Sequence, residues 1–280
     1  MKRALIIINI TKNESLNLAK EIEAFLNTKS ISCEFISFVG FGDRVSFCDF
    51  DFVITLGGDG TVLFAARNSV EQNIPIFPIN LGQFGFIASI QPENWKENLN
   101  SFLNDKSPIT LRNMLSVKVL RYGKEIYNSY ALNDAVICGK NAITTISLDI
   151  KYDDYNLCKL KSDGVIISTP TGSTAYSAAA GGPIVDPELD AIVMTPINSF
   201  SLSSRPIVLN TKGEILIAIE KSRTIEARIS VDGQEPVDLF TGDKIIIKQF
   251  EKKVSLVGCT SENFYKALRS KLNWSGGPHA

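Results

Sequence analysis

The chain has 280 residues, 44% of them hydrophobic, and a formal net charge of −1. This length exceeds the usual size of a single core, so we expect one large or two moderate domains. Because neither sign of charge forms a long block, a nucleic-acid-binding or membrane-surface protein is disfavoured and a small-molecule partner is favoured.

The first hundred residues alternate between strand and helix patterns. Strand patterns occupy residues 3–10, 32–38, 50–56 and 74–79, and helical spacing occupies residues 15–27, 61–70 and 93–104. This alternation predicts an α/β domain over residues 1–107 with a mostly parallel sheet. Ligands of such sheets bind beyond the carboxyl ends of the strands, where we expect the loops at Gly57 and at residues 80–86.

The next part of the chain has a different character. Over residues 108–260, short β-favouring runs separated by turn residues predict a β-rich, sandwich-like domain. These runs are residues 115–121, 125–131, 135–138, 145–152, 164–169, 207–209, 215–219, 226–231, 244–248 and 254–257. Residues 262–272 return to helical spacing. We therefore expect residues 261–280 to form a terminal helix and tail that pack back on the first domain.

Cysteine and histidine usage limits the possible chemistry. Five cysteines lie far apart without a Cys-x-x-Cys pair, which is typical of reduced thiols in a cytoplasmic protein. The single histidine, His279, is the penultimate residue. A Ser-His-Asp triad, a Cys-His pair and a histidine-based zinc site are therefore excluded. The apolar run at residues 4–10 is too short for a signal sequence and lacks a cleavage site, so we interpret it as a strand.

The segment Gly57-Gly58-Asp59-Gly60-Thr61 lies between a predicted strand and a predicted helix. Glycines let consecutive N–H groups converge on an anion, and a helix start adds unpaired donors and a positive dipole end. A carboxylate would repel phosphate, so we expect Asp59 to be unpaired and to accept a proton from an attacking hydroxyl or to hold a metal. The alternative is a tight turn with a capping aspartate.

Three weaker segments follow in the second half. Residues 163–176 run from a strand into a turn crowded with hydroxyls, which can hold a phosphate or a ribose, or can serve as capping and turn chemistry. Asn133 and Asp134 can accept from vicinal ribose hydroxyls, or can form a β-turn. Residues 231–234 are interpreted as a hairpin turn.

With these residues in view, the chain resembles the NAD kinase family over nearly its whole length. The first motif alone is shared with lipid kinases and phosphofructokinases, whereas the hydroxyl-rich segment ending at Tyr176 is more specific. The motifs that carry the resemblance are Gly57-Gly58-Asp59-Gly60-Thr61, Asn80-Leu81-Gly82 with Gly85-Phe86, Leu132-Asn133-Asp134, Asp163-Gly164 through Tyr176, Gly181-Gly182-Pro183-Ile184, Ser201-Leu202 with Arg205-Pro206, and Asp232-Gly233-Gln234.

The resemblance implies an activity and a set of site residues. The activity is transfer of the ATP γ-phosphoryl group to the adenosine-ribose 2′-hydroxyl of NAD, giving NADP. It further implies Mg²⁺ or another divalent metal ion, a homo-oligomer (dimer or tetramer) and Asp59 as the proton acceptor. The implied NAD contacts are Asp59, Gly60, Phe86, Asn133, Asp134, Lys161, Asp163, Thr174, Ala175, Tyr176, Ser177 and Gln234, and the implied ATP phosphate contacts are Gly57, Gly58, Gly60 and Thr61.

Within this set, the resemblance places Asn133 and Asp134 on ribose hydroxyls. Lys161 and Asp163 would contact the nicotinamide end or the diphosphate, and residues 174–177 would surround the adenosine part. Metal ligands are not assigned. Many family members have a histidine in the loop near Asn198, which this chain lacks.

Two rival functions share parts of these patterns. A lipid or sphingoid-base kinase would share the first motif but would need an apolar groove or a membrane-facing stripe, for which the sequence offers no clear candidate. A non-catalytic NAD(H)-binding sensor would need no base at Asp59.

Overall fold

The computed structural model describes residues 2–42, 45–82, 85–141, 144–201, 203–221 and 227–272. It divides the chain into two compact units, Met1–Arg112 with Lys253–Ala280, and Asn113–Lys252. His279, Leu202 and the predicted tail at residues 273–280 lie outside the described residues.

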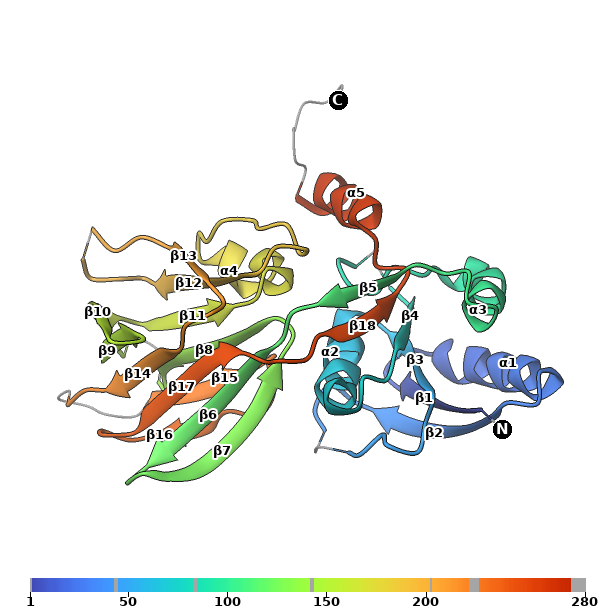
Figure 1. Ribbon diagram of the computed structural model, residues 1–280, viewed down its shortest axis with the longest axis horizontal. Helices are drawn as coiled ribbons and strands as arrows, with labels where there is room; N and C mark the ends of the chain where they lie inside the picture. Colours follow the sequence, from blue (N-terminus) through green and yellow to red (C-terminus); the bar gives the residue numbers. More distant parts are fainter. Residues whose placement is uncertain are drawn as a thin grey trace. The chain divides into compact units, whose positions relative to one another are not determined.

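The first unit contains a six-stranded, mostly parallel sheet in the order β2-β1-β3-β4-β18-β5 (Figure 1), as the alternating pattern predicts. Only β5 runs antiparallel to its neighbour. The strands are β1 (Arg3–Asn9), β2 (Ser32–Phe38), β3 (Phe52–Gly57), β4 (Ile76–Asn80), β5 (Ile109–Arg112) and β18 (Val254–Val257).

Helices cover both faces of this sheet. The helical elements are α1 (Ser15–Thr28), α2 (Asp59–Ser69), η1 (Val70–Gln72), η2 (Pro92–Asn94), α3 (Trp95–Leu103) and α5 (Ser261–Leu272). Alternate residues of β1, such as Ile6, share a buried cluster with Ile22 of α1 and Leu99 of α3. Helix α2 lies on the opposite face, as right-handed crossovers require when the sheet extends in both directions from β1 (Figure 1). Such two-sided coverage explains why β3 is buried along its whole length.

The boundaries of the units differ from the predicted ones. The predicted β-rich domain includes residues 109–112 and 254–257. In the structure these residues form β5 and β18, which extend the sheet of the first unit. Strand β18 joins this sheet beside β4, and α5 follows it within the same unit. Phe264 of α5 packs against Phe86, with 6.0 Å between the ring centroids.

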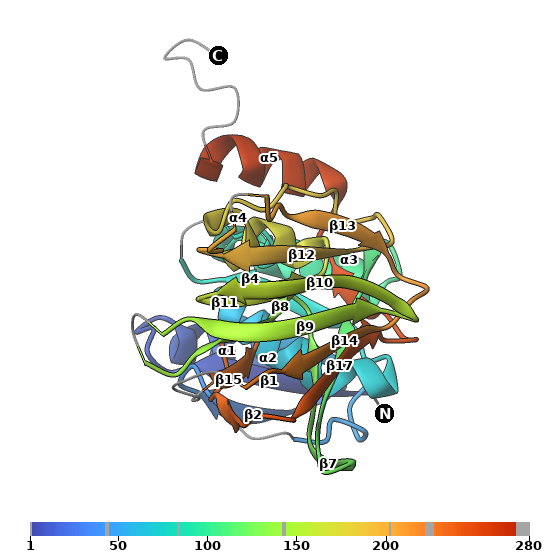
Figure 2. The same ribbon diagram turned by 90° about the vertical axis from the view of Figure 1, so that its left-hand side faces the viewer.

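The second unit is built from two six-stranded sheets, β10-β9-β14-β17-β6-β7 and β13-β12-β11-β8-β15-β16 (Figure 2). One buried cluster contains Val117 and Ile217 of the first sheet together with Ile137 and Ile167 of the second. The unit is therefore a sandwich, as predicted. Its elements are β6 (Leu115–Arg121), β7 (Lys124–Ala131), β8 (Asp134–Gly139), β9 (Ile146–Tyr152), β10 (Tyr155–Ser162), β11 (Gly164–Ser168), η3 (Thr171–Thr174), α4 (Tyr176–Ala179), β12 (Ala191–Ile197), β13 (Ile207–Asn210), β14 (Ile215–Ile219), β15 (Ala227–Val231), β16 (Val237–Leu239) and β17 (Lys244–Gln249).

Strands β5, β10, β12 and β16 are absent from the predicted runs. Strand β10 is an edge strand with mostly polar, outward side chains, so it carries no clear apolar alternation. Strand β12 is interior but contains Pro196, and proline argues against an interior strand. The ladder tolerates this proline because β13 pairs only with residues 191–194 and ends before it.

Within the described ranges, no helix is long and apolar enough to cross a membrane.

Candidate active site

The two glycine loops of the first unit lie at the same edge of its sheet. Strand β3 ends at Gly57 and β4 ends at Asn80, and these two residues are register partners. The Leu81 N–H donates to the Gly57 carbonyl at 2.8 Å, which ties the second loop to the first. Helix α2 begins at Asp59, with Gly58 as its N-cap residue. The strand, glycine turn and helix start therefore form the phosphate-binding layout that the sequence predicts.

The Asp59 side chain bridges these two loops. Its Oδ2 accepts a hydrogen bond from the Phe86 N–H at 3.1 Å, and its Oδ1 accepts from the N–H groups of Ile87 at 3.3 Å and Ala88 at 2.9 Å. The expectation that the Asp59 carboxylate is unpaired was wrong. Its three donors belong to residues 86–88, which lie 27 to 29 positions after Asp59 in the sequence and fold back beside it. A carboxylate offers about four acceptor sites, so roughly one is left for a substrate proton.

The glycines around Asp59 serve two different needs. A Cβ at Gly85 would collide with the Asp59 carboxylate, and one at Gly57 would collide with the Thr61 hydroxyl, so packing demands glycine at both. At Gly58 and Gly60 a Cβ would meet no atom of the described residues within 4 Å. Neither has a positive φ. Because nothing in the described protein requires glycine at Gly58 or Gly60, the free space there is suited to a close ligand.

Phe86 carries both a hydrogen bond and an apolar face. It is half-buried, its N–H holds Asp59, and its ring packs on Phe264 of α5. The ammonium group of Lys271, also on α5, lies 5.6 Å from the centroid of the Phe86 ring. The terminal helix thus fixes the ring whose backbone orients the carboxylate.

In the second unit, Asn133 and Asp134 lie at the start of β8 and are held by Asp232. The Asp232 carboxylate accepts from the N–H groups of Leu132 at 2.8 Å, Asn133 at 2.8 Å and Asp134 at 3.1 Å. Asp232 and Gly233 both have positive φ, as a type I′ turn requires, and the Gln234 N–H closes the turn on Val231. The predicted hairpin turn is present, and its aspartate also organises the candidate ribose site.

Asp134 is a buried acid beside a second carboxyl group. Burial, and then the charge of Asp232, raise the pKa of Asp134 to about 7. Within the described residues its carboxyl oxygens have no hydrogen-bond partner. At neutral pH Asp134 therefore populates a protonated form that can donate to a ligand and an ionised form that can only accept.

The hydroxyl-rich segment packs directly on this loop. The Thr169 N–H donates to the Asn133 carbonyl at 2.9 Å, and a Cβ at Gly172 would collide with the Asn133 backbone. Three buried oxygens here, Asn133 Oδ1, Ser168 Oγ and Thr171 Oγ1, have no hydrogen-bond partner within the described ranges. Buried polar atoms almost always have a hydrogen-bond partner, so these three oxygens are candidates for hydrogen bonds to water or to a ligand.

The remaining predicted residues of this unit divide between inward and outward positions. Ser177 is buried and its hydroxyl shares a 2.8 Å hydrogen bond with that of Thr195, so it faces the interior. Tyr176 is 47% exposed, and Thr174 and Ala175 are half-buried. Gln234 directs its amide towards the Asp232 carbonyl at 3.4 Å.

Lys161 and Asp163 are not brought together with Asn133 and Asp134. On β11, Gly164 is the partner of Cys138 and Ser168 is the partner of Asp134, so Asp163 lies at the opposite end of the strand. The five residue steps from Asp163 to Ser168 span about 17 Å along the strand, too far for one small group to contact both ends. The Asp163 carboxylate instead accepts a hydrogen bond on Oδ2 from the side-chain amide of Asn198 at 3.0 Å.

Comparison with known proteins decides the family. Residues 40–107 match the model of the ATP-NAD kinase N-terminal domain, and residues 132–259 match that of the C-terminal domain. The chain belongs to the ATP-NAD kinase family. The NAD kinase of Treponema denticola is 50% identical over 281 residues, covering 99% of this chain and 98% of that protein. The NAD kinase of Treponema pallidum (strain Nichols) is 40% identical over 275 residues, covering 98% and 90% respectively.

Solved structures agree with this assignment. An NAD kinase from Archaeoglobus fulgidus in complex with ATP has a TM-score of 0.78 at 26% identity, covering 98% of this chain and 99% of that one. Yeast NADH kinase complexed with NADH shares the fold, with a TM-score of 0.89 at 24% identity over 99% and 89% of the two chains. The chain has the activity of an ATP-dependent NAD kinase, as its motifs predict, and the lipid-kinase alternative is set aside.

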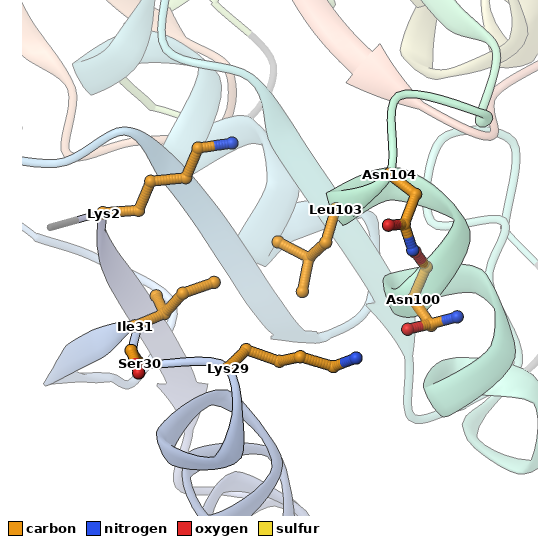
Figure 3. A pocket seen from close by; sticks show the side chains of 7 residues that line it. All are labelled: Lys2, Lys29, Ser30, Ile31, Asn100, Leu103 and Asn104. Carbon is orange, nitrogen blue, oxygen red and sulfur yellow. The ribbon is translucent and has the colours of Figure 1, made fainter.

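A surface pocket of about 260 Å³ in this NAD kinase lies away from the glycine loops. Lys2 and Lys29 extend into it opposite Asn100 and Leu103 of α3 (Figure 3). Lys2 precedes β1, so the pocket is at the amino ends of the strands, whereas α/β sheets bind ligands at the carboxyl ends.

Sequence reasoning missed two features that shape the candidate site of this NAD kinase. Asp232 was interpreted only as a turn residue, and the N–H groups of residues 86–88 were not predicted as partners of Asp59. The Asp-Gly pair at residues 232–233 indicates the turn, as predicted, but the three long-range hydrogen bonds that Asp232 accepts depend on tertiary packing. Glycines at Gly85 and Gly172 were recognisable, although the partners that they accommodate were not.

Proposed function

We propose that this NAD kinase transfers the γ-phosphoryl group of ATP to the 2′-hydroxyl of the adenosine ribose of NAD, with Asp59 as the proton acceptor. One observation carries the proposal. The Asp59 carboxylate is half-buried and held by three backbone N–H groups, and it lies between Gly58 and Gly60, at each of which an added Cβ would meet no described atom within 4 Å.

Phosphoryl transfer asks little covalent chemistry of the protein. It needs reactants held in line, neutralised phosphate charge, and an acceptor for the hydroxyl proton. The N–H groups at the start of α2 and its positive dipole end suit the ATP phosphates, which we assign to Gly57, Gly58, Gly60 and Thr61. Asp59 would take the proton of the attacking hydroxyl on its remaining acceptor site, and Gly60 and Phe86 would border NAD.

Charge neutralisation also requires a divalent cation. Among the described residues no group of three or more His, Cys, Asp or Glu side chains could hold a metal. This fits Mg²⁺, which protein sites of this kind usually bind through substrate phosphates and one or two carboxylates rather than through a protein cage. We therefore propose that Mg²⁺ or another divalent ion is held mainly by the ATP phosphates, where it neutralises charge.

The second unit supplies the proposed ribose contacts. Asn133 and Asp134 are fixed by their backbone to Asp232, which leaves both side chains available to hydroxyl groups. The unpaired oxygens of Asn133, Ser168 and Thr171 support a polar ligand here. We further assign to NAD the residues Lys161, Asp163, Thr174, Ala175, Tyr176, Ser177 and Gln234, among which Ser177 would act through its backbone because its hydroxyl is engaged.

Two properties of the whole protein complete the proposal. We infer a homo-oligomer, a dimer or tetramer, as the resemblance implies. We also infer a cytoplasmic location, which five free cysteines support.

The test is the identity of the product. ATP, Mg²⁺ and NAD should give a nucleotide that an NADP-specific dehydrogenase can reduce, because only the 2′-phosphate makes NADP. A 3′-phosphate would overturn the assigned hydroxyl. Binding of NAD without any product from a folded protein would favour the NAD(H)-binding sensor.

A further inference from the structure

Cys259 lies in the short connection between β18 and α5 and is 3% exposed. Its thiol donates to the Ile87 carbonyl with 2.8 Å between sulfur and oxygen. The Ser89 hydroxyl lies 3.6 Å from the same sulfur and is within 3.0 Å of the Gly258 carbonyl, to which it donates. The thiol is thus directed at the backbone segment that holds Asp59.

The Ile87 carbonyl and the Ala88 N–H belong to one peptide group. This N–H makes the shortest of the three hydrogen bonds to the Asp59 carboxylate, 2.9 Å to Oδ1. A peptide group is planar, so fixing its oxygen also fixes the direction of its N–H. A donor on the carbonyl also polarises the amide and strengthens the hydrogen bond that the N–H makes.

The surroundings of Cys259 keep it a donor. Burial raises the pKa of the Cys259 thiol to about 11, so it remains protonated at neutral pH. On the backbone side, the buried Arg112 guanidinium donates to the Cys259 carbonyl at 2.7 Å, which pins the connection in place. The thiol is therefore held at a fixed position and in its donating form.

We propose that Cys259 is a positioning residue for phosphoryl transfer, acting on the Asp59 carboxylate through the single peptide group between Ile87 and Ala88. This inference rests on the proposed role of Asp59 as proton acceptor. It assigns Cys259 no contact with substrate and no redox chemistry.

The first experiment compares Cys259→Ala, which removes the donor, with Cys259→Ser, which keeps a hydroxyl donor of similar size. We expect Cys259→Ala to lower kcat by about tenfold, a part of the roughly hundredfold loss that a 1 Å misplacement can cause. The KM values for ATP and NAD should change by no more than about twofold, since the substrate contacts are intact. Cys259→Ser should recover most of kcat, and Cys48→Ala, at an exposed cysteine of the same unit, should match the unsubstituted enzyme.

The second experiment is a double-mutant cycle with Asp59→Asn. If Cys259 acts through Asp59, adding Cys259→Ala to Asp59→Asn should lower the residual kcat no further. A kcat unchanged in folded Cys259→Ala, an equal loss in the Ala and Ser variants, or fully additive losses in the cycle would each overturn the inference. If Asp59→Asn itself keeps its turnover, the proposed function fails instead, so the two failures are distinguishable.

A second variant covers the case in which Cys259→Ala does not fold. Ser89→Ala removes the hydroxyl that contacts both the thiol and the Gly258 carbonyl. In the same cycle, Ser89→Ala should lower kcat when Asp59 is present and should leave the residual kcat of Asp59→Asn unchanged. Equal effects in both backgrounds would contradict the proposed route.

Discussion

Asp59 in the first unit and Asp232 in the second accept the same pattern of hydrogen bonds. Each carboxylate receives three consecutive backbone N–H groups, from residues 86–88 and from residues 132–134. They differ in access. Asp232 is 5% exposed in a tight turn, whereas Asp59 is half-buried at a helix start beside two glycines that face open space.

This difference separates a structural carboxylate from a chemical one. Both side chains stabilise a loop by accepting hydrogen bonds from its N–H groups, so the hydrogen-bond pattern alone cannot identify a base. The exposure of the carboxylate to a ligand distinguishes the two. We therefore expect loss of Asp232 to be felt mainly in stability and loss of Asp59 mainly in turnover.

The largest expected effect is on turnover in Asp59→Asn. The amide keeps one oxygen to accept from the loop but cannot take a proton, so kcat should fall roughly 10²–10⁴-fold, the usual contribution of a positioned base. NAD binding and the circular dichroism spectrum should be retained. Near-normal turnover of the folded variant would refute the base assignment and remove the contrast between the two carboxylates.

Asp232→Ala should show the complementary loss. It strands three backbone N–H groups, of which those of Leu132 and Asp134 are buried. Each unsatisfied buried group costs about 1–3 kcal/mol, so the free energy of unfolding should fall by at least about 2 kcal/mol. Urea denaturation measures this. Asp59→Ala is the matched control and should cost less, because the Asp59 side chain is half-buried and water can replace it more easily than it can replace Asp232, which is 5% exposed. A larger stability loss in Asp59→Ala would contradict the distinction.

The pH dependence of stability sharpens the description of the second unit. The pKa of Asp134 is raised to about 7, chiefly by burial, so between its ordinary value of 3.8 and 7 the folded state binds a proton that the unfolded state has released. The contribution of Asp134 to the free energy of unfolding is therefore fully present at low pH and declines as the pH rises towards 7.

Comparison with Asp134→Asn isolates this contribution from other titrating groups. The unfolding free energy of the unsubstituted protein, relative to that of Asp134→Asn, should be lower at pH 8 than at pH 5. The asparagine cannot ionise, so it serves as a permanent stand-in for the protonated acid. A difference that is independent of pH would mean that Asp134 titrates as an exposed carboxyl group.

Gly60→Ala should give the smallest and most selective effect. Among the residues that the structure describes, no atom lies within 4 Å of the added Cβ, and replacing a helical glycine by alanine stabilises by up to about 1 kcal/mol. Activity should nevertheless decrease, because the Cβ enters the space proposed for the substrates. Gly85→Ala, where the Cβ would collide with Asp59, should instead lose stability. Unchanged KM values in Gly60→Ala would show that no substrate approaches Gly60.

Much of the fold could be predicted because its elements carry their own periodicity. The parallel sheet, α1 and the sandwich core follow from apolar spacing, and the position of the glycine loops follows from the topology. Strand β10 escaped prediction because an edge strand needs no apolar face, and β12 because Pro196 is tolerated only where β13 has ended.

The candidate site was predictable in its residue types and not in its partners. Glycines and an aspartate between strand and helix indicate phosphate chemistry locally. In contrast, the three donors to Asp59 come from a segment placed by β4, and Asp232 reaches β8 across 98 to 100 positions of sequence. Contacts of this kind depend on how whole elements pack, which spacing along the chain does not encode.

The most direct test of the account is chemical rescue of the two alanine variants. Asp59→Ala and Asp232→Ala are assayed for NADP formation with increasing concentrations of acetate, a small carboxylate that can replace the missing proton acceptor. We expect Asp59→Ala to be nearly inactive and to regain turnover with acetate, and we expect acetate to leave the turnover of Asp232→Ala unchanged. Full turnover of Asp59→Ala without acetate, or rescue of Asp232→Ala in its place, would contradict the role of Asp59 as the proton acceptor.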